Sequence, residues 1–246
     1  MKIELFNVCK RFGKQIVLDD LNLTVEPNRI TVIIGKSGGG KSVLLKHVIG
    51  LIRPDSGSVF IGEDEISALD DKRLNEVRKN FGMLFQEAAL FDSMTVGENV
   101  AFPIKEHTRL SQEEIRTIVE EKLLQVGLTN VADKMPAQLS GGMRKRVGLA
   151  RAIALDPKII LFDEPTTGLD PIMRGAIDQL IVDTQRHTNA TCLVISHDID
   201  STFKIAHKVA MLYDGRIIEY GPPDKVKGSE NPFVRRFIEG KSFSEH

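Results

Sequence analysis

The chain of 246 residues is long enough for one large α/β domain or two small ones. Hydrophobic residues make up 41% of it and charged residues 27%, as in ordinary soluble globular proteins. The formal net charge of −1 excludes the bulk basic field that would favour nucleic acid or an acidic membrane surface as a partner. No apolar run approaches the ~18 residues of a membrane span, and Glu4 lies where a signal peptide would be apolar. Cys9 and Cys192 match no metal-binding spacing, so we expect reduced core thiols.

The first third of the chain predicts β-structure with two short helices. Leu21–Val25 alternates strictly between apolar and polar residues, which favours antiparallel strands within residues 1–30. Ile30–Ile34 is a short apolar run rich in β-branched residues and is typical of a buried strand. The further elements expected here are a helix at Val43–Ile49, a strand at Val59–Ile61, a helix at Asp71–Lys79 and a strand at Phe81–Phe85.

The middle of the chain predicts helices. Ser111–Glu114 has the pattern of a capping box, and the helix that it opens should stop at Gly127. A second helix is expected after Ser140–Gly142 and should run to about Leu155. We expect its basic residues to form a solvated face; these are Arg144, Lys145, Arg146 and Arg151.

From Lys158 onwards strands and helices alternate, which indicates a parallel sheet. A β-hairpin with a type I′ turn at Asp214–Gly215 should follow, and Asn231–Pro232 should open a last amphipathic helix that Gly240 closes. The elements expected between these points are a strand at Ile159–Phe162, a helix from Asp170–Pro171 to about His187, a strand at Thr191–Ser196 and a short helix at Asp200–His207.

The stretch Gly35–Ser42 fits the phosphate-binding pattern G-x-x-x-x-G-K-[S/T], with a strand before it and a helix after it. Such a turn directs backbone N–H groups at a phosphate chain, and the helix N-terminus adds positive potential. Lys41 should reach the β- and γ-phosphates, and the Ser42 hydroxyl should bind Mg²⁺. The residues expected to hold ATP in this stretch are Gly35, Lys36, Ser37, Gly38, Gly39, Gly40, Lys41 and Ser42.

Two carboxylates follow the buried strand Ile159–Phe162. Asp163 at a strand end beside the phosphate loop can hold Mg²⁺ through water. Glu164 next to it could orient and deprotonate an attacking water. Four apolar residues before Asp-Glu are common on their own, so the prediction depends on the pairing with Gly35–Ser42.

The decisive signal is Leu139-Ser-Gly-Gly-Met143, which simple P-loop kinases and GTPases do not need. With Gln86, Asp170 and His197 it resembles the ABC transporter ATPase family, in the expected order and over nearly the whole chain. The resemblance implies that Gln86 is the Q-loop residue, which contacts Mg²⁺ and senses the γ-phosphate. It also implies that Asp170 belongs to the D-loop and that His197 is the switch histidine.

The resemblance further implies a homodimer with two shared ATP sites. Ser140, Gly141 and Gly142 correspond to the signature motif, which the family places against the nucleotide of the opposite subunit together with Asp170. Phe12 corresponds to the aromatic position that stacks on adenine; the alternative is a strand phenylalanine packed in a core. Lys36 stands where many members carry proline.

The implied fold class is α/β. It consists of a P-loop NTPase (RecA-like) core with a mostly parallel sheet, an antiparallel β subdomain and an inserted α-helical subdomain. Residues 1–246 would form a single ABC ATPase domain. Its expected parts are residues 1–86 and 157–221 for the core and β subdomain, 87–156 for the helical subdomain, and 222–246 for a C-terminal helix and tail.

Three features are similar to the ATPase subunits of bacterial phospholipid transporters of the maintenance-of-lipid-asymmetry (Mla) type: Met143 and the stretches Ser42–Ile52 and Met83–Pro103. This similarity implies integral membrane permease subunits and an MCE-domain lipid-binding protein as partners. It also implies a peripheral position at the cytoplasmic face of the inner membrane. Ala88, Ala89, Leu90, Phe91 and Met94 follow the Q-loop, where the family docks a helix of the membrane subunit. For Leu90 and Phe91, ordinary core packing is an equal alternative.

Two other functions stay open. The cargo could be an amino acid, a metal complex or a lipoprotein, since cargo belongs to other subunits. The chain could also be a soluble ABC ATPase of the iron–sulfur assembly type. Repair and translation ATPases fit less well, because there is one phosphate loop, roughly 120 residues separate it from Asp163, and no heptad run indicates a coiled coil. Asn231–His246 could regulate, dimerise or merely pack.

Overall fold

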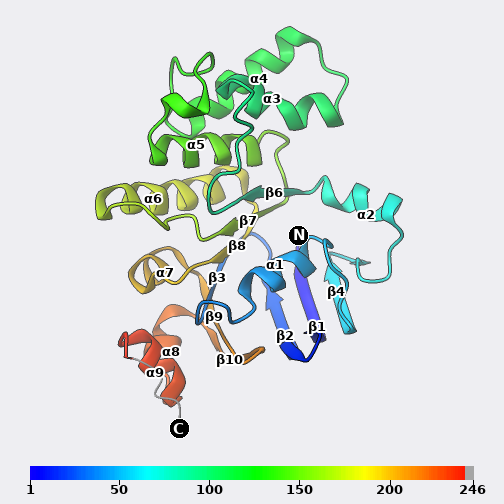
Figure 1. Cartoon of the computed structure of the whole chain (residues 1–246), viewed down its shortest axis with the longest axis vertical. Coiled ribbons are helices and arrows are strands. Elements are labelled where there is room, and N and C mark those ends of the chain that lie inside the picture. Colours follow the sequence, from blue (N-terminus) through cyan, green and yellow to red (C-terminus); the bar gives the residue numbers. More distant parts are fainter. Residues whose placement is uncertain (242–246) are drawn as a thin grey trace.

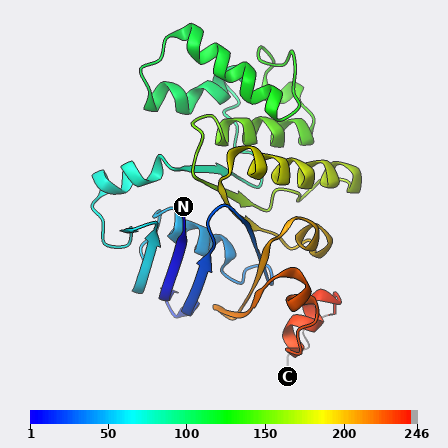
Figure 2. The ribbon, with the colours of Figure 1, turned by 180° about the vertical axis from the view of Figure 1, so that it is seen from behind.

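The computed structural model describes residues 1–241 and places a six-stranded sheet between a group of helices and a smaller antiparallel sheet (Figure 1). Seen from behind, α3–α5 form one end of the molecule, and the C-terminal helices lie at the other end (Figure 2). No helix among residues 1–241 combines the length and apolar character needed to cross a bilayer.

The smaller sheet is antiparallel and has the strand order β2-β1-β4-β5. Its strands are β1 (Ile3–Phe12), β2 (Gln15–Val25), β4 (Ser56–Ile61) and β5 (Asp64–Glu65). In β2, Leu21, Leu23 and Val25 are buried while Asn22 between them is exposed. The antiparallel structure expected from this alternation is therefore confirmed.

The larger sheet has the order β10-β9-β3-β8-β7-β6. All neighbouring pairs are parallel except β10 with β9. Its strands are β3 (Ile30–Ile34), β6 (Phe81–Leu84), β7 (Ile159–Asp163), β8 (Thr191–Ile195), β9 (Lys208–Tyr213) and β10 (Arg216–Gly221). Asp214 and Gly215 have φ values of 47° and 77°, so the expected type I′ turn is confirmed.

Both faces of the larger sheet are covered, because successive residues of each strand enter different cores. Ile160 and Phe162 pack toward α3–α5 and α6, whereas Ile159 and Leu161 pack toward the antiparallel sheet and α1. A parallel sheet buried on both faces gives continuous apolar runs in the sequence, as in Ile159–Phe162.

The helices mostly match the expected positions. They are α1 (Lys41–Val48), α2 (Asp71–Arg78), α3 (Val96–His107), α4 (Gln112–Gln125), α5 (Gly141–Ala152), α6 (Pro171–Thr188), α7 (Ile199–Ile205), α8 (Pro223–Lys227) and α9 (Pro232–Ile238), with a 3₁₀ turn at Pro136–Gln138. The capping box at Ser111–Glu114 is confirmed. Helices α3 and α8 were not predicted individually, although Thr95 and Glu98 form a second capping box at the start of α3.

Helix α5 differs from expectation in two respects. It ends at Ala152 with Ile153 as its C-cap, three residues short of Leu155. The expected solvated basic face is wrong: Lys145 is buried, and Arg146 donates to the Val126 carbonyl. Arg151 donates to the carbonyls of Ala88 and Ala89, both at 2.8 Å. Basic side chains of α5 therefore bind main-chain oxygens of neighbouring segments.

Close packing of α5 on β6 predicts a contrast between two glycines. A Cβ at Gly82 would lie 2.1 Å from the Ala152 carbonyl oxygen, whereas one at Gly175 in α6 meets nothing closer than 3.9 Å. We expect Gly82→Ala to lower the free energy of unfolding by about 1–3 kcal/mol because the backbone must shift. Gly175→Ala should raise it by roughly 0.5–1 kcal/mol, because alanine favours helix. Urea unfolding measures both; equal stability of the two variants would contradict the packing.

Candidate nucleotide-binding site

The phosphate loop joins the end of β3 to the start of α1. Gly40 is the N-cap of α1 and has no side chain with which to cap it. In contrast, a backbone N–H in the first turn of each of α2 to α6 donates to the side chain of the N-cap residue: Asp70, Thr95, Ser111, Ser140 and Asp170. The first N–H groups of α1 therefore depend on another acceptor, and a phosphate oxygen suits them.

Two glycines of the loop are required by close neighbours and by backbone conformation. Gly35 has φ 152°, and a Cβ there would lie 2.2 Å from the Leu212 carbonyl oxygen in β9. Gly40 has φ 95°, and its Cβ would lie 2.9 Å from the Val17 carbonyl oxygen in β2. The loop is thus held against strands of both sheets.

Lys41 is 5% exposed, and its ammonium lies inside the loop. It donates to the carbonyls of Gly35 at 2.8 Å and Lys36 at 2.9 Å. Burial lowers the pKa of Lys41, and the negative charges of Glu164 and Asp163 partly oppose that shift. Two of its three N–H donors are used, so one remains for a phosphate oxygen.

Ser42 and Asp163 meet where the loop and β7 end. The Ser42 hydroxyl donates to Asp163 Oδ1 at 3.5 Å. Burial raises the pKa of Asp163, and the neighbouring Glu164 raises it further, while Ser42 and Lys41 act in the opposite direction. Mg²⁺ prefers oxygen ligands such as hydroxyls and carboxylates. A cation at this place would also favour the ionised form of Asp163, so the two residues fit this metal.

Glu164 and His197 are brought together by adjacent parallel strands. Asp163 in β7 pairs with Ile195 in β8, so the residues that follow both strands leave the sheet at the same edge. Glu164 Oε2 lies 3.3 Å from His197 Nδ1 and accepts a hydrogen bond from the Thr167 hydroxyl at 2.9 Å. Glu164 and His197 therefore form a pair among the residues expected to be catalytic, which also include Lys41 and Gln86. Thr167 is a further partner of Glu164 that the sequence did not indicate.

Gln86 and Phe12 lie at two other edges of the site. Leu84 pairs with Phe162, so Gln86 follows β6 at the level of Glu164, and it is exposed. Phe12 is 49% exposed, and Lys10 Nζ lies 5.6 Å from its ring centroid. The alternative of a core phenylalanine at position 12 is wrong.

A cavity of about 240 Å³ adjoins the phosphate loop between the β1–β2 and β9–β10 hairpins. Gln15, which pairs with Phe12, lines it together with Lys36 and Tyr213. The Lys36 ammonium lies 5.3 Å from the centroid of the Tyr213 ring. A second cavity of about 430 Å³ has Glu164 and His197 on one wall and Phe237 and Ile238 of α9 on the other. No local sequence pattern indicates that α9 lies beside the catalytic pair.

The signature residues do not join this site within one chain. Ser140 is the N-cap of α5, and its hydroxyl oxygen accepts from the Met143 N–H at 3.3 Å. Asp170 caps α6. Among residues 1–241 no hydrogen bond connects Ser140 or Asp170 with Lys41, Ser42 or Asp163.

A family model described as ABC transporter matches residues 18–167 of the chain. The chain belongs to the ABC transporter family. It is an ATPase of that family that binds ATP, and its fold class is the expected one. A solved structure described as the dimeric post-hydrolysis state of the ATP-binding cassette MJ0796 bound to ADP and Pi is 34% identical. It has a TM-score of 0.81 and covers 90% of this chain and 98% of its own.

Two curated relatives extend over nearly all of this ABC cassette. The "Intermembrane phospholipid transport system ATP-binding protein MlaF" of Haemophilus influenzae is 44% identical over 98% of the chain and 91% of its own length. The "Probable ribonucleotide transport ATP-binding protein mkl" of Mycobacterium tuberculosis is also 44% identical, over 98% of the chain and 67% of its own length. The expected similarity to the Mla type is confirmed.

The raised pKa of Asp163 predicts a pH-dependent stability. Between the ordinary carboxyl pKa and the raised value, the folded protein binds more protons than the unfolded chain, so this group makes the nucleotide-free protein less stable as pH rises. We expect Asp163→Asn to unfold at higher urea than the wild type near about pH 7, with the difference shrinking toward about pH 4. A wild type that is more stable than the variant at neutral pH would contradict this.

Proposed function

We propose that this chain is the ATP-hydrolysing subunit of a dimeric ABC transporter that moves phospholipid at the cytoplasmic face of an inner membrane, through separate membrane subunits. The observation that carries the enzymatic part is the Glu164–His197 pair beside the loop that holds Lys41 and Ser42. We take residues 1–246 as one ABC ATPase domain with its core in 1–86 and 157–221 and its helical subdomain in 87–156. The expected single helix after residue 221 is wrong, since α8 and α9 both lie there, and residues 242–246 of the expected tail lie outside the described residues.

In the proposed mechanism the phosphate loop binds and orients the triphosphate. The N–H groups of Gly38, Gly40 and the first turn of α1 donate to phosphate oxygens, whereas the Gly39 N–H donates to the Lys36 carbonyl at 3.1 Å. Lys41 supplies its remaining N–H between the β- and γ-phosphates. Ser42, Asp163 and Gln86 would hold Mg²⁺, which supplies charge neutralisation on the phosphate oxygens when it is bound. Phe12 offers an exposed ring face for adenine.

Hydrolysis then needs a base and a donor. Glu164 accepts a proton from the attacking water as the water oxygen bonds to the γ-phosphorus. The bond between the γ-phosphorus and the bridging oxygen breaks, and its electrons stay on ADP. His197 Nδ1 lies 3.3 Å from Glu164 Oε2, and a doubly protonated ring would donate to Glu164 through Nδ1 and to a γ-phosphate oxygen through Nε2. The Thr167 hydroxyl donates to the same carboxylate oxygen at 2.9 Å.

The arrangement of the signature helix supports the dimer. The Ser140 hydroxyl caps α5 but keeps its own proton, so it can donate to a phosphate oxygen of a second chain. Ile172 next to the D-loop is 83% exposed, and an apolar side chain there suits an interface. The related cassette MJ0796 is described as dimeric.

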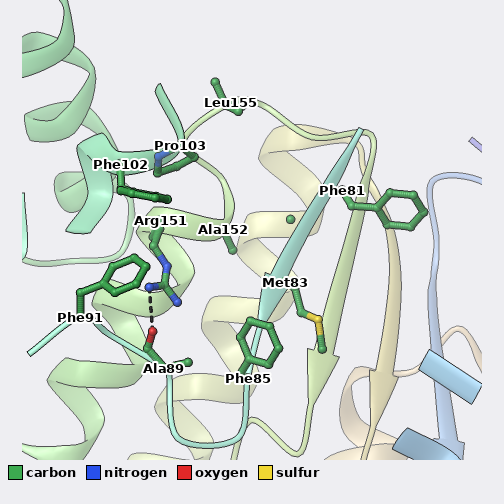
Figure 3. Close-up of a pocket in the computed structure, with 11 residues that line it drawn as sticks. Phe81, Met83, Phe85, Ala89, Phe91, Phe102, Pro103, Arg151, Ala152 and Leu155 are labelled. Atoms are coloured by element: carbon green, nitrogen blue, oxygen red, sulfur yellow. Dashed lines mark hydrogen bonds between the residues drawn. The ribbon is translucent and has the colours of Figure 1, made fainter. Parts of the chain in front are cut away.

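An apolar groove supports a membrane-subunit partner. The cavity measures about 320 Å³ and lies between β6, the segment after Gln86, and α3 and α5 (Figure 3). Phe91 and Phe102 contact each other with tilted rings whose centroids are 5.0 Å apart, and Arg151 lies over the Phe91 ring while donating to Ala89. On the sequence alone, core packing and helix docking are equal alternatives for Leu90 and Phe91. Leu90 packs against the core, whereas Phe91 lines the groove. An amphipathic helix suits such a groove.

The cargo proposal is supported by the similarity to MlaF, and the similarity to mkl favours a ribonucleotide as the second candidate. The test uses the chain copurified with its membrane subunits and reconstituted in liposomes. We expect ATPase activity to be higher in phospholipid liposomes than in detergent without phospholipid. Added ribonucleotides other than ATP should leave the activity unchanged. The reverse pattern would exchange the two candidates.

Glu164→Gln tests the catalytic base. The amide keeps the shape of the carboxylate but cannot accept the proton, so we expect hydrolysis to fall by about 100-fold or more with ATP binding retained. The variant should accumulate as an ATP-bound dimer in size-exclusion chromatography. Near-normal turnover would remove Glu164 from the role of base.

Phe91→Glu tests the groove. A carboxylate in place of the ring should weaken docking of an apolar helix by about tenfold or more, seen as loss of copurified membrane subunits. Leu124→Glu is the matched control, because Leu124 is 63% exposed on α4 outside the groove. Both variants should bind ATP as the wild type does; equal copurification of the two would reject the groove as the docking site.

A further inference from the structure

Lys145 is a buried cation in the signature helix that no step above uses. It lies in the second turn of α5, which Ser140 opens, and it is 6% exposed. Its ammonium donates to the main-chain carbonyls of Thr167 at 3.2 Å and Glu164 at 3.5 Å. A side chain of the helical part of the chain thus reaches the turn that carries the catalytic carboxylate.

The two carboxylates whose charges act on the Lys145 ammonium belong to the segments that carry the nucleotide-binding site. No carboxylate among the described residues lies within ion-pair distance of it, and burial lowers its pKa. The negative charges that oppose this shift belong to Glu87, which follows the Q-loop glutamine, and to Glu164. A buried ammonium is costly unless its donors are satisfied, and here main-chain oxygens of the Glu164–Thr167 turn accept from two of its three donors.

Glu164 has a backbone that needs such support. Its φ is 49°, a left-handed conformation that a residue with a side chain rarely adopts without help from its surroundings. Its N–H donates to the Ile195 carbonyl at 3.0 Å, which fixes the peptide before it. Lys145 binds the carbonyl after it at 3.5 Å, and this carbonyl also accepts from the Thr167 N–H at 3.3 Å. These contacts hold the peptide units on both sides of the catalytic side chain.

We propose that Lys145 is a positioning residue for Glu164 of its own chain and links the signature helix to the catalytic turn. The proposal rests on the proposed function, in which Glu164 takes the proton of the attacking water. It assigns Lys145 to the site completed by its own phosphate loop, whereas Ser140 on the same helix would serve the site of the partner chain. Helix α5 would then contact one nucleotide and one catalytic base belonging to different sites.

The first test compares Lys145→Met, which keeps the aliphatic stem without donors, with Lys145→Arg, which keeps charge and donors. We expect Lys145→Met to lower kcat by about 10- to 100-fold through misplacement of the carboxylate, with KM for ATP within about twofold. Lys145→Arg should restore most of kcat. Lys105→Met on the exposed face of α3 is the control and should match the wild type.

Wild-type kcat in Lys145→Met, or equal loss in the Met and Arg variants, would overturn the proposal. If Lys145→Met does not fold, Lys145→Gln takes its place, since its shorter side chain cannot reach both carbonyls. Equal kcat for the Gln and Arg variants would then overturn it. If Glu164→Gln turns over normally, the proposed function fails first, independently of any Lys145 result.

The second test separates the two sites in mixed dimers purified with two affinity tags. A Lys145→Met chain paired with a Glu164→Gln chain leaves active only the site that holds the Glu164 of the Lys145→Met chain, and we expect its activity to be lost. A chain with both substitutions paired with a wild-type chain leaves active the site that receives the altered signature helix, and we expect its activity to persist. The opposite result would assign Lys145 to the partner's site.

Discussion

The burial of the Lys41 ammonium is the interaction on which the rest of the site depends. A cation with so little exposure is tolerable only where acceptors surround it, and the Gly35 and Lys36 carbonyls supply two of them. These oxygens point inward because the loop folds back on itself, which requires the backbone of Gly35 beside β9. The carboxylates at the end of β7 add the compensating field. Loop, strand ends and lysine therefore stabilise one arrangement together.

The parallel sheet provides the second constraint. Since β3, β7 and β8 run in the same direction, the phosphate loop, the Asp163–Glu164 pair and His197 leave the sheet at one edge. The helical group adds what the sheet lacks: α5 contacts the segment after Gln86 through Arg151 and the catalytic turn through Lys145. A movement of α5 would therefore act on both segments at once.

Much of this was predictable from the sequence, because its signals are local. Glycines in the phosphate loop, the strict alternation of Leu21–Val25 and the Asp214–Gly215 turn each express a backbone requirement within a few residues. The wrong predictions involve long-range contacts. The basic residues of α5 have the pattern of a solvated face, and only the tertiary fold brings the carbonyls that accept hydrogen bonds from the buried Lys145. Likewise, no local pattern indicates that Thr167 would bind Glu164, or that α9 would approach His197.

The absence of a side-chain cap on α1 connects nucleotide concentration to folding stability. A ligand that satisfies backbone donors of the native state alone stabilises it by RT ln(1 + [L]/Kd), which is about 2.7 kcal/mol at one hundred times Kd. That is a sizeable part of the roughly 5–15 kcal/mol that holds a typical domain folded. The ATP level of the cell would thus set not only how fast this cassette works but also how much of it escapes unfolding and proteolysis.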